Sequence, residues 1–302
     1  MDIAEPVPAA AEVKIRVRAA SLNPIDWKIR AGHLRFLPMF RMPPRGIGCD
    51  FSGEVVTVGG GAISFHVGER VFGSLPPFPR DGALAEYVVA VAGRITSVPD
   101  NVSDEAAAAL PIAGGTALQA LSDDAHLALG QRVLITGAAG GVGHFATQIA
   151  KHVGAHIVGV CSAGNVEFVR GLGADEVVDY AHDDFTRRDD RFDVVLDAAG
   201  ASSFIAARRV LTETGCYLNT GGNASAAVGT VIGAVFARMT SHQSAIVLML
   251  KAGTALFERI AALAQQEKLH AHVERTIDME EVANAMAAME TGHSRGKIIV
   301  RL

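Results

Sequence analysis

The residues best placed for chemistry form a glycine-rich turn, residues 137–143, which reads Gly-Ala-Ala-Gly-Gly-Val-Gly and directly follows an apolar run. Gly140 and Gly143 leave no side chain between the backbone and a bound anion, or between the flanking strand and helix. The free N–H groups of the first helical turn then point at the ligand, and the helix dipole favours its negative charge. The sequence therefore predicts binding of a diphosphate by Ala139, Gly140, Gly141, Val142 and Gly143.

Elements on both sides of this turn have the order that such binding requires. Residues 133–136 form the predicted strand before it, residues 142–153 the helix after it, and residues 157–161 the next strand. A glycine pattern alone is a weak signal, whereas a strand, a glycine turn, a helix and a second strand in this order favour a dinucleotide site.

Strands and helices alternate from Arg132 onward. Two further helices, 254–266 and 279–289, and a final strand, 297–300, follow the alternating part. The alternating order is typical of an α/β fold with a doubly wound parallel sheet. The six strands predicted for this sheet are 133–136, 157–161, 176–178, 193–197, 216–220 and 244–248.

The first 112 residues have a different pattern, with period-two alternation and frequent Gly and Pro. This pattern predicts an irregular β-rich domain that ends in an alanine-rich helix at residues 104–109. Its predicted strands are 12–18, 54–58, 70–72 and 85–89.

Composition excludes several classes of function. The chain has 302 residues and a net charge of −5, and its 27 Lys and Arg are dispersed, so neither nucleic acid nor an anionic membrane is an expected partner. Its three cysteines lie far apart, which argues against a disulfide framework or a clustered metal site. The apolar stretches 226–237 and 244–250 are too short to span a membrane. The first of them lines an apolar pocket or subunit contact, or forms a buried helix. We expect a cytoplasmic protein.

Seven segments, in order, resemble the zinc-free medium-chain dehydrogenase/reductases, in their quinone oxidoreductase and zeta-crystallin branch. They are the glycine turn and residues 21–32 (SLNPIDWKIRAG), 48–55 (GCDFSGEV), 82–87 (GALAEY), 110–117 (LPIAGGTA), 172–175 (LGAD) and 292–298 (GHSRGKI).

The resemblance implies a fold and an assembly. It implies a Rossmann domain at residues 113–267 and a GroES-like catalytic domain built from residues 1–112 and 268–302. It also implies a homodimer in which two Rossmann sheets join edge to edge. Family members usually begin with a further strand pair before the segment that matches residues 12–17, so we expect either a truncated start or a lost edge strand.

The metal-dependent relatives hold zinc with a Cys, a His and a second Cys, and the matching positions here are Asn23, Cys49 and Ile112. An amide and an isoleucine are not zinc ligands at ordinary affinity, so we expect no zinc. Without a Lewis acid, alcohol oxidation loses its usual driver. Hydride reduction of an electron-poor small molecule, a quinone or an α,β-unsaturated carbonyl compound, is the better match.

Cofactor preference is predicted from the end of the second strand of the Rossmann sheet, where NAD-selective proteins carry Asp or Glu. This chain has Cys161 and Ser162 there, which favours NADPH over NADH, although Glu167 lies close. Ser162 either donates to the 2′-phosphate or caps a helix, and the resemblance places Tyr180 near the same phosphate. Arg295 and Lys297 either approach the cofactor or belong to a solvated turn.

The resemblance makes Asn23 and Asp26 the candidate catalytic residues, because their motif faces the nicotinamide in the family. Asn23 would orient the carboxamide or the substrate oxygen, and Asp26 would position the ribose or relay a proton. The alternative for Asn23 is an ordinary turn before Pro24, and the alternative for Asp26 is an exposed turn carboxylate. Thr116, Ala198 and Gly221 are further cofactor-binding candidates. Two other functions stay open, namely an NADPH-binding protein with a structural or regulatory role and an alcohol dehydrogenase-type activity.

Overall fold

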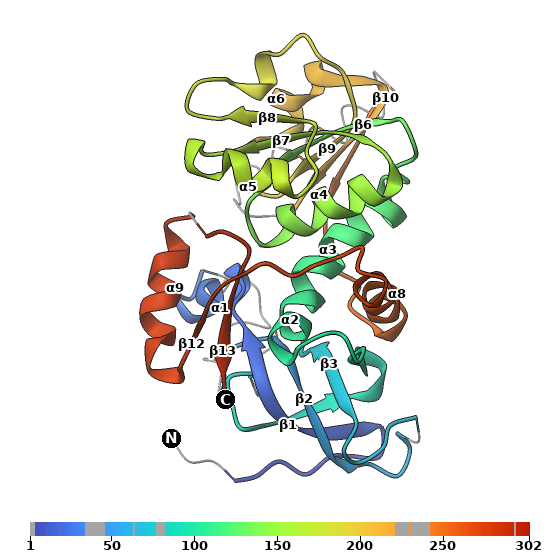
Figure 1. Ribbon diagram of the computed structural model, residues 1–302, viewed down its shortest axis with the longest axis vertical. Coiled ribbons are helices and arrows are strands. Elements are labelled where there is room, and N and C mark those ends of the chain that lie inside the picture. Colours follow the sequence, from blue (N-terminus) through green and yellow to red (C-terminus); the bar gives the residue numbers. More distant parts are fainter. Residues whose placement is uncertain are drawn as a thin grey trace. The chain divides into compact units, whose positions relative to one another are not determined.

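The computed structural model describes residues 4–33, 46–62, 64–76, 82–220, 230, 233, 242–292 and 294–302. The chain divides into two compact units, each built around its own sheet (Figure 1). The first unit comprises residues 1–115 and 251–302, and the second comprises residues 116–250.

The second unit contains a six-stranded parallel sheet in the order β11-β10-β9-β6-β7-β8. Counted along the chain this order is 3-2-1-4-5-6 when read from β8, the order of a Rossmann sheet. The predicted α/β fold is therefore confirmed. The strands are β6 (Arg132–Thr136), β7 (His156–Cys161), β8 (Glu176–Asp179), β9 (Phe192–Asp197), β10 (Leu211–Asn219) and β11 (Ser244–Val247).

Helices cover both faces of this sheet. Figure 1 shows α4 (Gly141–Val153) and α5 (Val166–Gly171) on one side and α6 (Phe204–Ala207) on the other. α4 ends at Gly154, whose φ of 83° is the left-handed conformation that glycine adopts without strain. Residues 226–237, for which a pocket, a contact or a buried helix was expected, lie outside the described residues except for Thr230 and Gly233.

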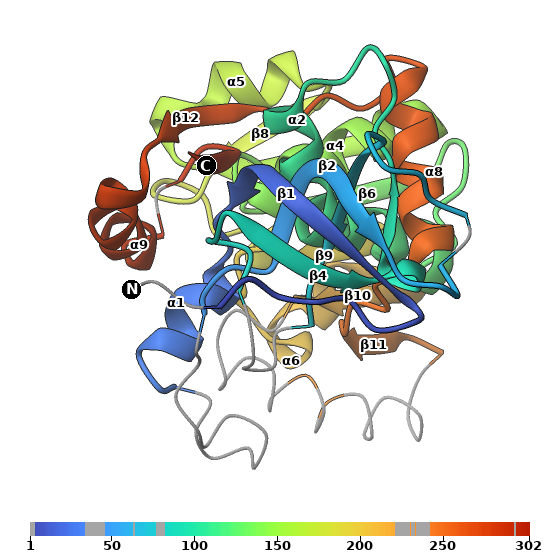
Figure 2. The same cartoon turned by 90° about the horizontal axis from the view of Figure 1, so that it is seen from below.

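The first unit contains a sheet in the order β12-β13-β1-β2-β3-β5, and β4 also pairs with β1, as the neighbouring ribbons in Figure 2 show. Among the strand pairs formed by the described residues of this sheet, only β12–β13 is parallel. The strands are β1 (Glu12–Ser21), β2 (Asp50–Val58), β3 (Arg70–Ser74), β4 (Tyr87–Val91), β5 (Ile95–Ser97), β12 (Val273–Ile277) and β13 (Lys297–Arg301).

Helices join the strands of the first unit. One continuous helical run begins with α2 (Asp104–Ala109), widens into the π-helical η3 (Leu110–Gly114), and continues through α3 (Gly115–Leu118) and the π-helical η4 (Gln119–Asp124) in the second unit. The other helices are α1 (Pro24–Arg30), α8 (Thr254–Gln265) and α9 (Val282–Glu290). Short 3₁₀ turns occur at 92–94 and 279–281 in the first unit and at 163–165, 185–187 and 208–210 in the second.

The position of α8 differs from the expected domain boundary at residue 267, because the structure assigns this helix to the first unit. Thr254 Oγ1 donates to Ala92 O and Ile95 O, at 3.2 and 3.0 Å. The Phe257 ring packs against Phe72 of β3, with ring centroids 6.1 Å apart. These contacts tie α8 to the β-rich sheet, a partner that an amphipathic pattern alone does not specify.

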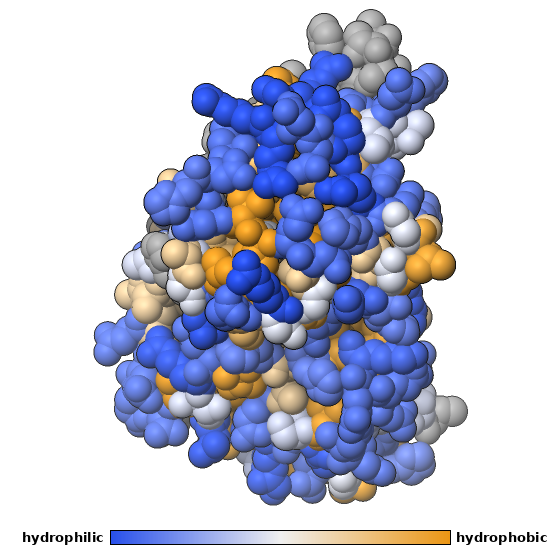
Figure 3. All heavy atoms as spheres, turned by 45° about the horizontal axis from the view of Figure 1, so that its top comes forward, coloured by the Kyte–Doolittle hydropathy of each residue, from blue (hydrophilic) through white to orange (hydrophobic). Residues whose placement is uncertain are grey.

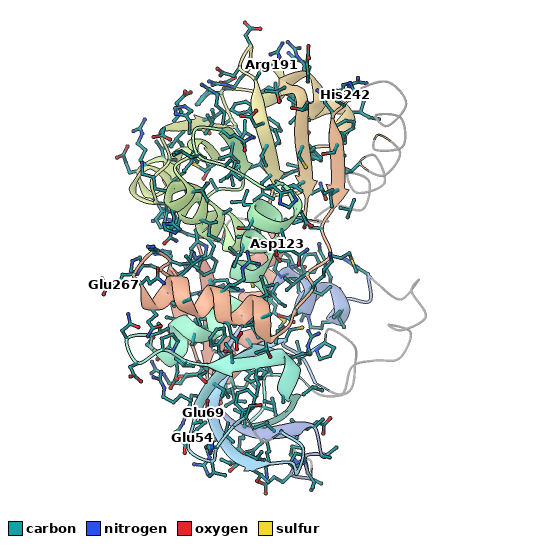
Figure 4. The ribbon with its side chains drawn as sticks, turned by 90° about the vertical axis from the view of Figure 1, so that its right-hand side faces the viewer. Glu54, Glu69, Asp123, Arg191, His242 and Glu267 are labelled. Atoms are coloured by element: carbon teal, nitrogen blue, oxygen red, sulfur yellow. The ribbon has the colours of Figure 1, made fainter. Side chains whose placement is uncertain are left out.

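The amino ends of the second unit's strands carry a network of charges. Arg188 pairs with Glu176 and Asp190, at 3.1 and 2.6 Å, and Arg132 pairs with Asp190 at 3.2 Å. Arg191 and His242, labelled in Figure 4, mark the starts of β9 and β11. In Figure 3 the top of the molecule is mostly hydrophilic. No helix in the described part of the chain is long and apolar enough to cross a membrane.

Candidate functional site

The glycine turn lies between β6 and α4 in the second unit. Gly140 is the N-cap of α4 with an extended backbone, and its N–H donates to Gly137 O at 2.9 Å. A Cβ built on Gly143 would lie 2.1 Å from Gly137 O, so only glycine allows this close approach of helix to turn. The first N–H groups of α4 have no acceptor within the helix. The turn therefore offers a donor cradle and a helix N-terminus that fit a diphosphate.

The residues predicted for the 2′-phosphate lie at the adjoining ends of β7 and β8. Cys161 is buried, and burial raises the pKa of its thiol to about 11. Ser162 is half-buried at the N-cap position of the 3₁₀ turn 163–165, where its side chain makes no capping hydrogen bond, and its hydroxyl accepts from Asn165 Nδ2 at 3.1 Å. Tyr180 is exposed, and its N–H donates to Cys161 O at 3.2 Å. Asp179 is the register partner of Cys161, so a carboxylate lies one strand away.

The carboxyl ends of β6, β9 and β10 carry a polar row, in which Asp197 is the register partner of both Thr136 and Asn219. Asp197 is fully buried. Its carboxylate accepts from Thr136 Oγ1 at 2.5 Å and from Tyr217 OH at 2.8 Å. It also accepts from Ser202 N at 2.9 Å, Ala201 N at 3.2 Å and Asn219 Nδ2 at 3.4 Å. Burial, together with this carboxylate, raises the pKa of Tyr217.

Two of the three remaining cofactor candidates of the second unit are among the described residues. Ala198 directly follows β9, and its carbonyl accepts from Thr220 Oγ1 at 3.3 Å. Thr116 is half-buried in α3. Gly221 lies outside the described residues.

In the first unit, the two candidate catalytic residues lie at the corner where β1 turns into α1. Asn23 is the N-cap of α1, and its N–H donates to Asp26 Oδ2 at 2.7 Å. Both side chains are only 2% exposed. This burial shows that Asp26 is not the exposed turn carboxylate that was its alternative, whereas Asn23 does lie in the turn before Pro24.

The Asn23 amide links a buried cation to a buried anion. Its Oδ1 accepts from Lys297 Nζ at 2.6 Å, and its Nδ2 donates to Asp50 Oδ2 at 2.9 Å and Ser21 O at 3.3 Å. Both amide hydrogens are therefore used inside the unit, and none is left to donate to a substrate oxygen. Within this structure the Asn23 amide connects charged groups, and its expected role of orienting the carboxamide or the substrate oxygen stays a prediction.

Burial controls the charge of this cluster, which comprises Asn23, Asp26, Asp50 and Lys297. Burial raises the pKa of Asp26 to about 7, against the Asn23 N–H bond and with a contribution from the Asp50 charge. It raises the pKa of Asp50 to about 6, opposed by the charge of Lys297 and the bond from Asn23. It lowers the pKa of Lys297. Each pKa shift reflects a charge taken out of water and only partly compensated by its neighbours.

The sequence reasoning missed Asp50 and gave Lys297 other candidate roles. Lys297 is 3% exposed, and its ammonium group also donates to Leu22 O at 2.8 Å, so the expected solvated turn is wrong for this residue. Asp50 is fully buried and also accepts from Ile112 N, at 3.1 Å, in the π-helical turn η3. The quoted segment 48–55 contains Asp50, and a charged residue within an apolar strand pattern was the available signal.

The structure shows the surroundings of Asn23, Cys49 and Ile112, the three positions that match the zinc ligands of metal-dependent relatives. The Asn23 amide is already bonded, Ile112 contributes a backbone N–H, and burial raises the pKa of the Cys49 thiol well above its usual value. Among the described residues, no group of three or more His, Cys, Asp or Glu is arranged to hold a metal ion.

The sheet order and the glycine turn define the class of protein, a dinucleotide-binding Rossmann protein with a β-rich second domain. Residues 9–100 match the family model described as alcohol dehydrogenase GroES-like domain, and residues 172–300 match the one described as zinc-binding dehydrogenase.

Relatives and solved structures narrow this class. The chain is 35% identical to the chloroplast envelope quinone oxidoreductase homolog of Arabidopsis thaliana, covering 98% of this chain and 91% of that protein. It is 34% identical to the mitochondrial NAD(P)H oxidoreductase RTN4IP1 of Mus musculus, covering 96% and 82%. The quinone oxidoreductase of Coxiella burnetii superposes with a TM-score of 0.88 at 32% identity, covering 100% and 94%. The chain belongs to the quinone oxidoreductases of the medium-chain dehydrogenase/reductase family and is an oxidoreductase.

Proposed function

We propose that this protein is an NADPH-dependent, zinc-independent oxidoreductase that reduces quinones or α,β-unsaturated carbonyl compounds. The observation that carries the proposal is the glycine turn between β6 and α4, where Gly143 can carry no side chain and the helix N-terminus is open. The relatives named as quinone and NAD(P)H oxidoreductases support the same chemistry.

The cofactor would be held by backbone groups of the turn. Ala139, Gly141, Val142 and Gly143 would donate to the diphosphate, and Gly140, whose N–H is bonded to Gly137 O, would let the backbone approach it. Ala198 and Thr116 are the candidates for the remaining contacts. When bound, NADPH supplies a hydride, which a metal-free site can deliver to a conjugated, electron-poor acceptor.

Preference for NADPH over NADH is proposed from the neutral end of β7. No carboxylate occupies the position of Cys161 or Ser162, where one would repel a 2′-phosphate. Asp179 lies one strand away, and its negative charge opposes the same phosphate. We therefore expect a modest preference, measured as the ratio of the dissociation constants for NADH and NADPH.

Zinc independence is proposed from the chemistry of the matched positions. Zinc takes thiolate, imidazole or carboxylate ligands. The thiol of Cys49 holds its proton more tightly than usual because of burial. Asn23 and Ile112 supply no such ligand. The oxyanion formed on the acceptor would be stabilised by hydrogen bonds from backbone donors, and solvent would deliver the proton.

Assembly and location stay proposals as well. β11 is an edge strand of its sheet, and edge strands present unpaired backbone groups that a second copy can cover. We propose a homodimer, which light scattering on the purified protein would measure. We also propose the cytoplasm as its location, which imaging of the tagged full chain would test.

The experiment that tests the proposed function measures NADPH binding, NADPH consumption and bound zinc on one preparation. We expect binding, consumption with at least one quinone or alkenal, and far less than stoichiometric zinc. Tight NADPH binding without turnover of any acceptor would favour a structural or regulatory role. Activity that follows the zinc content would favour the alcohol dehydrogenase-type alternative.

A further inference from the structure

Asp197 is a buried carboxylate for which the proposed function gives no role. The donors to its two oxygens are hydroxyl, amide and backbone N–H groups, all of them neutral. Among the described residues, no Lys, Arg or His forms an ion pair with it. A buried charge that is stabilised by neutral dipoles keeps its field, because no nearby cation cancels it.

The same carboxylate fixes the backbone that follows β9. Ala201 N and Ser202 N donate to it directly. Thr136 Oγ1, which donates to Asp197, also accepts from Ala199 N at 3.3 Å. A Cβ on Gly137 would lie 3.2 Å from Ala199 N, so this segment packs against the glycine turn. Asp197 thus sets segment 198–202 relative to the turn that would hold the diphosphate.

The position of Asp197 in the sheet indicates which part of a cofactor would feel its charge. It ends β9, the first strand of the second half of the 3-2-1-4-5-6 order. In such sheets each half binds one mononucleotide, with the diphosphate at the turn after the first strand. The half formed by β9, β10 and β11 is then the one for the nicotinamide mononucleotide.

We propose that Asp197 is a positioning residue whose charge also favours the oxidised nicotinamide over the reduced one. This inference rests on the proposed NADPH dependence. Transfer of a hydride, which is one hydrogen nucleus with two electrons, to the acceptor would leave the neutral reduced nicotinamide as a cation. An anion buried beneath that half of the site stabilises the cation more than the neutral reduced ring, which favours hydride release.

The test compares dissociation constants for NADP⁺ and NADPH in wild type and Asp197→Asn, measured by calorimetry without any acceptor. We expect the ratio of the NADP⁺ constant to the NADPH constant to rise about tenfold in D197N, which corresponds to the loss of about 1.4 kcal/mol of attraction between the Asp197 charge and the oxidised ring. The matched control is Tyr217→Phe, which removes one donor and keeps the charge. Its ratio should equal that of the wild type.

A folded D197N whose ratio changes by less than about twofold would overturn the proposal, as would an equal change in Y217F. If D197N does not fold, Thr136→Val tests the positioning role, because it keeps the charge and releases Ala199 N. We expect T136V to weaken both forms equally, by about tenfold, and Thr136→Ser to restore both. Unchanged constants in T136V would overturn the proposal. A wild-type protein that binds neither form would instead refute the proposed function.

Discussion

Replacing Gly143 by alanine tests the geometry of the glycine turn directly. The added methyl carbon would lie 2.1 Å from Gly137 O and 2.7 Å from Ala138 Cα, and both are backbone atoms that no rotamer change can move. An ordinary carbon contact is 3.4 Å or more, so α4 and the turn must separate by roughly 1 Å. The variant therefore changes the spacing of the N–H donors without changing any charge.

The expected loss of NADPH affinity follows from those donors. A hydrogen bond to a charged group contributes about 1.5–3 kcal/mol, and every 1.4 kcal/mol is a factor of ten in affinity. Loss of about one such bond predicts an NADPH dissociation constant 10- to 100-fold above wild type. Forcing a methyl group into this packed turn should also lower the free energy of unfolding by about 1–3 kcal/mol. Calorimetric titration and urea denaturation measure the two effects.

The matched control is Gly171→Ala in α5. A Cβ at Gly171 meets nothing within 4 Å, so this variant should bind NADPH like wild type and unfold at an equal or higher urea concentration. Wild-type NADPH affinity in a folded G143A protein would refute the assignment of the turn as the diphosphate site. Equal losses of affinity in the two variants would refute it as well.

Three further predictions concern buried groups of the first and second units. Because the pKa of Asp26 is about 7 when folded and 3.8 ordinarily, this group favours folding less as pH rises from about 4 to 7. Relative to wild type, Asp26→Asn should therefore gain stability as the pH rises over that range, by up to ~4 kcal/mol, because each pH unit contributes about 1.36 kcal/mol. A difference between the urea denaturation curves of the two proteins that stays constant with pH would contradict this expectation. Lys297→Met should lower the free energy of unfolding by about 3–5 kcal/mol, because it leaves Asn23 Oδ1 and the buried Asp50 charge without the cation. An unchanged urea midpoint would contradict the stabilising role of Lys297 in this cluster. The thiols of Cys49, Cys161 and Cys216 should react slowly with a thiol reagent until urea unfolds the chain, because burial raises the pKa of each. A thiol that reacts rapidly in the native protein would contradict this expectation for that cysteine.

The second unit was predictable from sequence because its signals are local. Strands buried on both faces read as apolar runs, and the glycine turn fixes where α4 begins. β10 is the exception, since it starts at Leu211 and the prediction began at Cys216. The intervening residues 212–215 are Thr-Glu-Thr-Gly, and the pairing with β9 shifts register between Leu211 and Cys216, so a polar, irregular stretch concealed the first part of the strand.

The buried cluster of the first unit was not predictable in the same way. Lys297 contacts Leu22 and Asn23, which lie 275 and 274 residues earlier in the chain. A Gly-Lys pair at the start of the final strand has the composition of a solvated turn. The motif identified Asn23 and Asp26 as important, whereas their roles depend on a cation and an anion brought in by β13 and β2. Residue type indicated chemistry here, and only the fold showed that the chemistry faces inward.

The most direct test of the central claim is the consumption of NADPH by chelator-treated protein whose metal content has been counted, with a panel of quinones and alkenals as acceptors. We expect that at least one acceptor is reduced, and that deuterium placed on the hydride-bearing carbon of the nicotinamide leaves the cofactor as the acceptor is reduced. No consumption with any acceptor, or consumption that returns only when zinc is added back, would contradict a zinc-independent hydride transfer from NADPH.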